Sequence, residues 1–277
     1  MKFKSFFISA SLIIIGCKNN TLYDSKISQL EETSIIDLVP NIQKQGMKWL
    51  LKNMDTDDKN LLSTSFLIDN CNYAYEAWDN TPWGKVNESL FLEYVLPFSS
   101  LNERRDNWRQ DFYERFFPIV KNAKSAYEAA AILNNNIFEM VGVIYSTKRP
   151  KADQSPYESI DAGLASCTGL SFMLIDACRS VGIPARFVGT PMWYNNSGNH
   201  SWVEIWDNGW HFTGAFEPTG DRLNEGWFAS LAARAVEGHP EYGIYAATWK
   251  KTGVFFPMDW KPGIEKYYAY DVTSSYQ

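Results

Sequence analysis

One cysteine of the chain, Cys167, lies where a thiol could be reactive. Ser166 before it is a preferred helix N-cap, and apolar residues follow at three- and four-residue steps until Gly182. We therefore expect a helix that begins at Cys167, where free amides and the positive end of the helix dipole favour the thiolate, the nucleophilic form of the side chain. Cys178 falls inside the same predicted helix, and we expect it to be a buried apolar residue.

A base and an acid for this thiol could come from His200 and Glu217, which flank two short alternating runs joined at Asn208-Gly209. Asn-Gly is the strongest short hairpin signal. If these two residues form the turn, His200 lies opposite Glu217, with Cβ atoms about 5 Å apart. A four-residue loop keeps this register, whereas a three-residue loop places Phe216 opposite His200 and breaks the pair. A helix-start cysteine, a strand histidine and a strand acid follow the logic of a Cys-His-acid triad.

The segments "SCTGLSFMLIDACRSVGIPARFVG", "NHSWVEIW" and "GWHFTGAFEPTGD" together resemble the transglutaminase-like superfamily, which is related to the papain-like thiol enzymes. The resemblance covers roughly residues 123–220. It implies that Cys167 attacks a carbonyl carbon, that His200 takes and returns the proton, and that Glu217 orients the ring. The family usually has an Asp-Pro pair at the position of Glu217-Pro218, so the acid here is longer by one methylene.

Other residues near the predicted triad have supporting or alternative roles. Asp221 is the alternative acid, and Glu204, which fits the family's HxWxE pattern, is expected to support the site. The backbone amide of Cys167 is expected to be one oxyanion donor. Gln154 and nearby tryptophans are weaker candidates for the second donor.

Aromatic residues around His200 are candidates for substrate contact. Trp193 and Tyr194 precede it in a polar loop and Trp202 follows it on the strand, so we expect all three to bind substrate, with plain packing as the alternative. The chain has no close-spaced ligand pair such as CxxC or HExxH. We therefore expect no metal and no cofactor.

The first residues are typical of an export signal. Lys2 and Lys4 precede an apolar run over residues 6–15 that is shorter than the roughly 20 residues of a spanning helix. The run ends in Gly16-Cys17 and resembles a bacterial lipobox, which implies that residues 1–17 are a lipoprotein signal with an acylated Cys17 that anchors the chain to a membrane. We expect a lipid-anchored protein of the bacterial cell envelope, periplasmic or surface-exposed, with residues 18–34 as a flexible tether.

Export would permit disulfides. Three cysteines remain besides Cys17, an odd number, so at least one is free or pairs with another chain. Cys167 and Cys178 are about 16 Å apart on one predicted helix and cannot pair with each other. Whether Cys71 is paired stays open.

The distribution of apolar residues predicts the fold class. Spacing is helical between residues 35 and 145, whereas short alternating runs follow residue 185, so we expect an α+β protein. The resemblance implies a helical N-terminal region over residues 35–122 and a transglutaminase-like catalytic core over residues 123–277. In that core the nucleophile helix packs on an antiparallel sheet, followed by C-terminal strands.

Composition narrows the classes of function. The 277-residue chain is 45% hydrophobic and 21% charged, with a net charge of -6 and no basic run interleaved with aromatics, so we expect a globular monomer that does not bind nucleic acid. Our leading hypothesis is a thiol enzyme that hydrolyses amide bonds in peptides, glycopeptides or cell-wall fragments. The alternatives are an acyl transferase that cross-links protein glutamines to amines, and a binding module that retains an unused triad.

Overall fold

The computed structural model describes residues 20–277, and helices dominate its first half. Side-chain caps start the long helices: Ser63, Ser125 and Ser166 each accept a hydrogen bond from a first-turn amide. The helices before the first strand are α1 (Asn20–Asp24), α2 (Glu32–Ile36), α3 (Lys44–Asn53), α4 (Thr56–Leu61), α5 (Thr64–Asp79), α6 (Glu88–Tyr94), α7 (Arg109–Val120) and α8 (Ala126–Val141), with 3-10 turns at Ile27–Gln29 and Asn41–Gln43.

Strands dominate the second half. The elements are β1 (Ile144–Tyr145), α9 (Pro156–Ala162), β2 (Leu164–Ala165), α10 (Cys167–Ser180), β3 (Ala185–Thr190), β4 (His200–Trp206), β5 (Trp210–Thr213), α11 (Ala229–Ala232), β6 (Tyr245–Thr248) and β7 (Tyr268–Asp271), before a final 3-10 turn at Thr273–Tyr276. Five strands form one antiparallel sheet in the order β5-β4-β3-β6-β7, and β1 pairs with β2 in parallel. Helices first and an antiparallel sheet later confirm the predicted α+β class.

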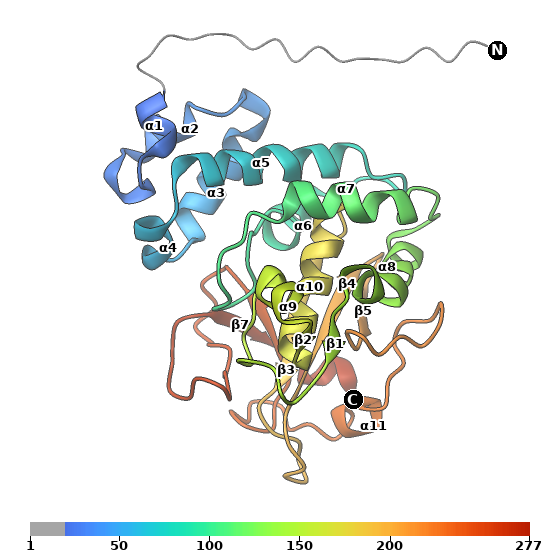
Figure 1. Cartoon of the computed structure of the whole chain (residues 1–277). Helices are drawn as coiled ribbons and strands as arrows, with labels where there is room; N and C mark the ends of the chain where they lie inside the picture. Colours follow the sequence, from blue (N-terminus) through green and yellow to red (C-terminus); the bar gives the residue numbers. More distant parts are fainter. Residues whose placement is uncertain (1–19) are drawn as a thin grey trace, which may run out of the picture.

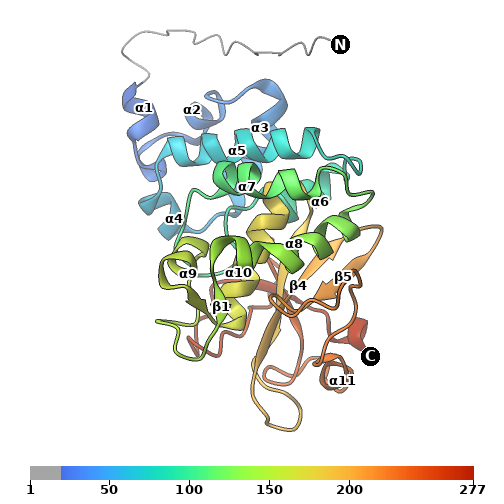
Figure 2. The same cartoon turned by 45° about the vertical axis from the view of Figure 1, so that its right-hand side comes forward.

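Helix α10 is the centre of the molecule. It packs against β3 and β4 on one side and against α7, α8 and α9 on the other, and in Figures 1 and 2 it runs between the N-terminal helices and the strands. Every residue from Thr168 to Ser180 is buried. Because a helix covered all round cannot bend or slide without breaking this packing, the position of Cys167 at its first turn is fixed by the core.

Two large hydrophobic clusters divide the chain near residue 100. One gathers buried residues from Ile27 to Phe98, and the other begins at Leu101 and includes α7, α8, α10 and the sheet. Phe112 and Phe116 of α7 belong to the second cluster, with the nucleophile helix. The region of residues 35–122, expected to be one helical unit, therefore contributes to both clusters.

Part of the segment expected to be a flexible tether, residues 23–30, instead packs on the first hydrophobic cluster. Ile27 is buried and its amide donates a hydrogen bond to the Leu62 carbonyl oxygen at 3.2 Å. Tyr23 and Leu30 pack on the same cluster, so apolar residues at three- and four-residue spacing hold this segment against α5.

Cys17 and the predicted lipoprotein signal lie outside the described residues. Within residues 20–277 no helix is both long and apolar enough to cross a bilayer.

The β4–β5 hairpin has a different register from the one expected. Trp206 pairs with Trp210 and Val203 with Thr213, so the loop has three residues, Asp207 to Gly209. Asn208 has a φ of 56°, and the Asp207 amide donates to the Gly209 carbonyl at 2.9 Å. The predicted ladder that opposes His200 and Glu217 is therefore wrong by one residue.

Candidate active site

Cys167 occupies the first position of α10, as predicted from the N-cap. The Ser166 hydroxyl accepts a hydrogen bond from the Gly169 amide at 3.3 Å and donates one to the Ala152 carbonyl at 2.8 Å, which fixes the start of the helix. Cys167 is half-buried and lines a cavity of about 520 Å³ together with His200 and Glu217.

His200 begins β4 and is 95% buried, with 5% of its surface exposed. The hydroxyls of Thr168 on α10 and Ser201 on β4 lie 3.1 Å apart, a hydrogen bond that ties the cysteine end of the helix to the histidine end of the strand. Helix α10 and strand β4, which are separated in sequence by β3, thus hold Cys167 beside His200.

The acid–base properties of Cys167 and His200 are coupled. Burial raises the pKa of Cys167, but hydrogen bonds from His200 and Ser201 and the charge of His200 outweigh it, so the pKa falls below its ordinary value of 9.0. Burial lowers the pKa of His200, but hydrogen bonds to Cys167 and Glu217 prevail and raise it from 6.5 to about 9. Both shifts favour a thiolate beside an imidazolium.

Glu217 reaches His200 from an irregular turn rather than from a strand. Its Oε2 lies 3.6 Å from Nε2 of His200. Strand β5 ends at Thr213, Phe216 takes a φ of 64°, and the Glu217 amide donates to the Gly214 carbonyl at 3.2 Å. A Cβ at Gly214 would lie 2.2 Å from Oε2 of Glu217, so only glycine leaves room for this carboxylate.

Asn134 of α8 holds the turn that carries Glu217, a role the sequence did not reveal. Its amide nitrogen donates to the Thr213 hydroxyl at 2.9 Å and to the Gly214 carbonyl at 2.8 Å, while its oxygen accepts from the Phe216 amide at 3.0 Å. The side chain is buried, so these bonds are shielded from water. An asparagine within a helix gave no sequence signal of this contact.

Trp227 is the second residue that sequence reasoning missed. Its indole N–H donates to Oε2 of Glu217 at 2.8 Å, and its ring centroid lies 4.8 Å from that of His200. The residue is 58% exposed, so it forms an outer wall over the His-Glu pair. It lies in a short irregular segment without helix or strand periodicity, which left no pattern from which to infer this role.

Comparison with known proteins gives the family of this segment. Residues 115–215 match the model of the transglutaminase-like superfamily, a range that includes Cys167 and His200 and ends two residues before Glu217. Over this range the chain is similar to the transglutaminase-like superfamily. The match confirms the resemblance drawn from the sequence and supports a thiol enzyme of this superfamily.

More distant comparisons add little to the transglutaminase-like assignment. No curated protein matches the chain significantly. Among solved structures, a candidate cysteine protease from Cytophaga hutchinsonii is similar at a TM-score of 0.37 and 17% identity, over 48% of this chain and 44% of that one. The match thus spans less than half of that protein's length.

None of the three predicted substrate residues lines the cavity of Cys167. Trp193 and Trp202 are 2% and 0% exposed and stack on each other at 6.1 Å. Both pack beside the His200 ring and belong to a hydrophobic cluster, so the packing alternative is correct for them. The Tyr194 hydroxyl accepts a hydrogen bond from Arg234 at 2.9 Å and also does not line the cavity. The residues that do line it with the triad include Tyr145, Arg149, Asn199, Asp259 and Trp260.

The side chains that were candidate oxyanion donors are engaged elsewhere, which leaves the backbone of α10. Gln154 is 1% exposed and its amide nitrogen donates to the carbonyls of Glu158 and Leu164, so it is not available. The indole nitrogens of Trp227 and Trp260 are likewise engaged by other side chains. The first amides of a helix have no intrahelical acceptor, so the amide of Cys167 stays the expected donor.

The other two candidate acids, Glu204 and Asp221, lie in different surroundings. Glu204 forms a buried ion pair with Arg186 at 2.6 Å and accepts a hydrogen bond from Tyr276, which joins β4 to β3 and to the C-terminal turn. Asp221, the alternative acid, is exposed and lines a separate hollow beside α8. Glu217 is therefore the carboxylate that meets His200.

The remaining cysteines are free and buried. Cys71 and Cys178 form no disulfide, and burial raises the pKa of both, that of Cys71 to about 12. Across residues 20–277 no group of three or more His, Cys, Asp or Glu side chains is arranged to hold a metal.

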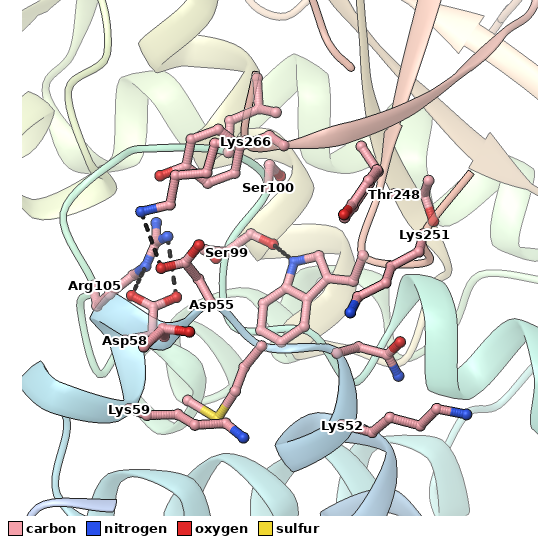
Figure 3. Close-up of a pocket in the computed structure, with 17 residues that line it drawn as sticks. Lys52, Asp55, Asp58, Lys59, Ser99, Ser100, Arg105, Thr248, Lys251 and Lys266 are labelled. Atoms are coloured by element: carbon pink, nitrogen blue, oxygen red, sulfur yellow. Dashed lines mark hydrogen bonds and ion pairs between the residues drawn. The ribbon is translucent and has the colours of Figure 1, made fainter. Parts of the chain in front are cut away.

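A second cavity, of about 370 Å³, lies between the N-terminal helices and the β6–β7 segment (Figure 3). Both of its carboxylates are paired: Arg105 contacts Asp58 at 2.9 Å, and Lys266 contacts Asp55 at 2.9 Å. Figure 3 shows these pairs on one wall of the cavity. No cysteine or histidine lines it, so this cavity has no thiol-imidazole pair like that of Cys167 and His200.

Proposed function

We propose that this transglutaminase-like protein is a thiol hydrolase of amide bonds in peptides, glycopeptides or cell-wall fragments. Cys167 is the nucleophile, His200 the general base and acid, and Glu217 the residue that orients the imidazole. The observation that carries this proposal is that Cys167, at the start of α10, lines one cavity with His200 and with Glu217, whose Oε2 lies 3.6 Å from Nε2 of His200. The lowered pKa of Cys167 and the raised pKa of His200 agree with it.

The reaction proceeds in two halves. The Cys167 thiolate adds to the carbonyl carbon, and the oxygen takes up the negative charge, which the Cys167 amide stabilises. The imidazolium of His200 gives its proton to the leaving amine as the C–N bond breaks, and a thioester remains. His200 then removes a proton from water, whose oxygen attacks the thioester and releases the acid and the thiolate.

The shielding of the His-Glu pair supports this mechanism. Trp227 covers Glu217 and donates a hydrogen bond to it, so water has less access to the bond that fixes the imidazole. Asn134 and Gly214 hold the acid at a distance of 3.6 Å from His200 without help from a strand ladder. This arrangement orients the imidazole that interacts with Cys167.

Iodoacetamide labelling and peptide cleavage in matched variants test the proposal. In the native protein we expect rapid alkylation of Cys167, and cleavage of a peptide mixture that is lost in Cys167→Ala and kept in Cys178→Ala. Equal alkylation of Cys167 and Cys178 in the native protein would falsify the proposal. Addition of a primary amine tests whether water or an amine accepts the acyl group. Amide products in place of acids would show that the protein is an acyl transferase and not a hydrolase.

We also propose that the chain is exported and acylated at Cys17. The support is the sequence alone: two lysines, a short apolar run and Gly16-Cys17. Metabolic labelling with a fatty acid is expected to mark the wild-type chain and to miss Cys17→Ser. Acylation that persists in that variant contradicts the anchor at Cys17.

A further inference from the structure

A third cavity, of about 650 Å³, adjoins the cavity of Cys167. Three separate segments form it, around Met192, around Glu241 and over residues 254–265. Asp259 lines both cavities, and the side chain of Asn199, next to His200, donates a hydrogen bond to it. The two cavities therefore adjoin at Asp259, which is hydrogen-bonded to the residue that precedes His200.

The walls of the third cavity are apolar. Met192, Val254, Met258 and Ile264 line it, and Val254 and Ile264 remain 40% and 44% exposed. Phe256 anchors the segment to the core through its contact with Phe187 at 5.3 Å. Exposed apolar side chains on a wall anchored to the core are typical of a binding surface.

The charges of this cavity all have one sign. Glu241, Asp259 and Glu265 line it, and none of its lining residues is Lys, Arg or His. The nearest cations along the chain are engaged elsewhere: Lys261 contacts Asp153 at 3.6 Å and Lys266 contacts Asp55 at 2.9 Å. Neither Glu241 nor Glu265 forms an ion pair within the described residues.

We propose that this acidic apolar cavity, defined by Met192, Glu241, Asp259, Ile264 and Glu265, binds a basic side chain of the substrate close to the bond that Cys167 cleaves. Apolar walls suit the methylene stem of a lysine or arginine, and carboxylates at the rim suit its charged head. The inference rests on the proposed function, because it names the substrate class of the same site.

The third cavity differs from the second cavity, shown in Figure 3, in the pairing of its carboxylates. There every carboxylate that lines the wall has a cation within reach, so a ligand would have to break an existing ion pair. Here Glu241 and Glu265 have no ion pair to lose, and only Asp259 is influenced by the charge of Arg149 in the neighbouring cavity. A cationic ligand therefore gains attraction to the two glutamates without that cost.

Peptidyl chloromethyl ketones test the inference, because each probe alkylates the thiol with loss of chloride. Lysine, norleucine or glutamate is placed at the first, second or third position from the reactive carbon. At one position we expect the lysine probe to inactivate at least tenfold faster than the norleucine probe and the glutamate probe to be slowest. The advantage of lysine should shrink as ionic strength rises.

Substitutions of exposed carboxylates test whether this cavity is the source of the preference for lysine. Glu241→Gln combined with Glu265→Gln is expected to abolish the preference for lysine, whereas Glu237→Gln, an exposed acid on the same segment outside the cavity, should keep it. Equal rates for lysine and norleucine at all three positions, with rapid iodoacetamide labelling of Cys167, would overturn this inference and leave the proposed function standing. Slow labelling by iodoacetamide as well would overturn both.

Discussion

The two ends of α10 belong to one rigid helix, yet they have opposite roles. At the N-terminal end Cys167 is half-buried, faces a cavity and has a lowered pKa. At the C-terminal end Cys178 is fully buried and has a raised pKa. The same side chain is thus a nucleophile at one end and packing at the other, because only the first end meets an imidazole and unsatisfied helix amides.

Buried cations hold the C-terminal end of α10. Arg179 donates hydrogen bonds to the carbonyls of Tyr94, Ser99 and Ala185, and Arg109 donates to those of Val95 and Leu96. Burial lowers the pKa of Arg109 to about 9. These bonds join the helix to the segment between the two hydrophobic clusters, so this end of α10 stabilises the fold while the other end is free for chemistry.

The largest expected effect is a loss of stability at the C-terminal end. Arg179→Met leaves several buried carbonyls without a donor, and we expect the free energy of unfolding in urea to fall by about 3–5 kcal/mol. Arg115→Ala, which removes an exposed i,i+4 pair with Asp111, is the matched control and should cost less than about 1 kcal/mol. A loss at Arg179 as small as that of the control would show that both ends of the helix are held by packing alone.

The next effect is on reactivity at the N-terminal end. In the wild type, alkylation of Cys167 should rise with pH below the ordinary thiol pKa of 9.0 and change again near pH 9, where His200 loses its proton. His200→Ala removes the group that lowers the thiol pKa while burial still raises it, so the rise moves to higher pH. Each pKa unit is about 1.4 kcal/mol, and we expect at least about tenfold slower alkylation at pH 7. An unchanged profile would mean that the helix terminus alone activates the thiol.

A smaller effect is expected for Cys178→Ala. Loss of one buried sulfur leaves a small void, and the free energy of unfolding should fall by about 1 kcal/mol. The pH profile of Cys167 alkylation should not move, since the two thiols share a helix but no contact partner. A shift of that profile would show that packing at one end is transmitted to the other.

The smallest effect concerns the acid. Glu217→Gln removes the charge but keeps an oxygen for the Trp227 hydrogen bond, so His200 loses one of the groups that raise its pKa. Titration of the imidazole by NMR should show its pKa below about 9, and alkylation of Cys167 should slow by less than in His200→Ala. Because Glu217 is 32% exposed and its oxygen lies 3.6 Å from the ring, we expect an effect below about 1 kcal/mol. A larger loss than that of His200→Ala would reverse the assigned roles.

Local signals predicted the reactive helix correctly. An N-cap serine, helical spacing and a glycine stop are properties of neighbouring residues, and α10 starts at Cys167 as they indicate. The order of helices and strands was likewise readable from periodicity. The burial of Trp193 and Trp202 could not be predicted from local sequence. Both pack in one cluster with Phe228, which follows them by more than twenty residues.

Glu217 does approach His200, but not through the strand register that the sequence suggested. The hairpin sequence suggested a ladder, but Asp207 accepts a hydrogen bond from the Tyr127 amide at 2.9 Å, and the loop closes with three residues. Asn134, also on α8, then holds the turn that returns the acid to the ring. Both contacts span about eighty residues of sequence, so no local pattern contains them.

The sequence by itself determined which thiol stands at a helix start, which histidine follows it and the α+β order of elements, because these depend on residues within a few positions of one another. Only the tertiary structure decided how Glu217 reaches His200, why Trp227 covers it, and that an acidic apolar cavity adjoins the site. The physical reason is that hydrogen bonds and cavities join segments far apart in the chain, whose meeting depends on how the whole core packs.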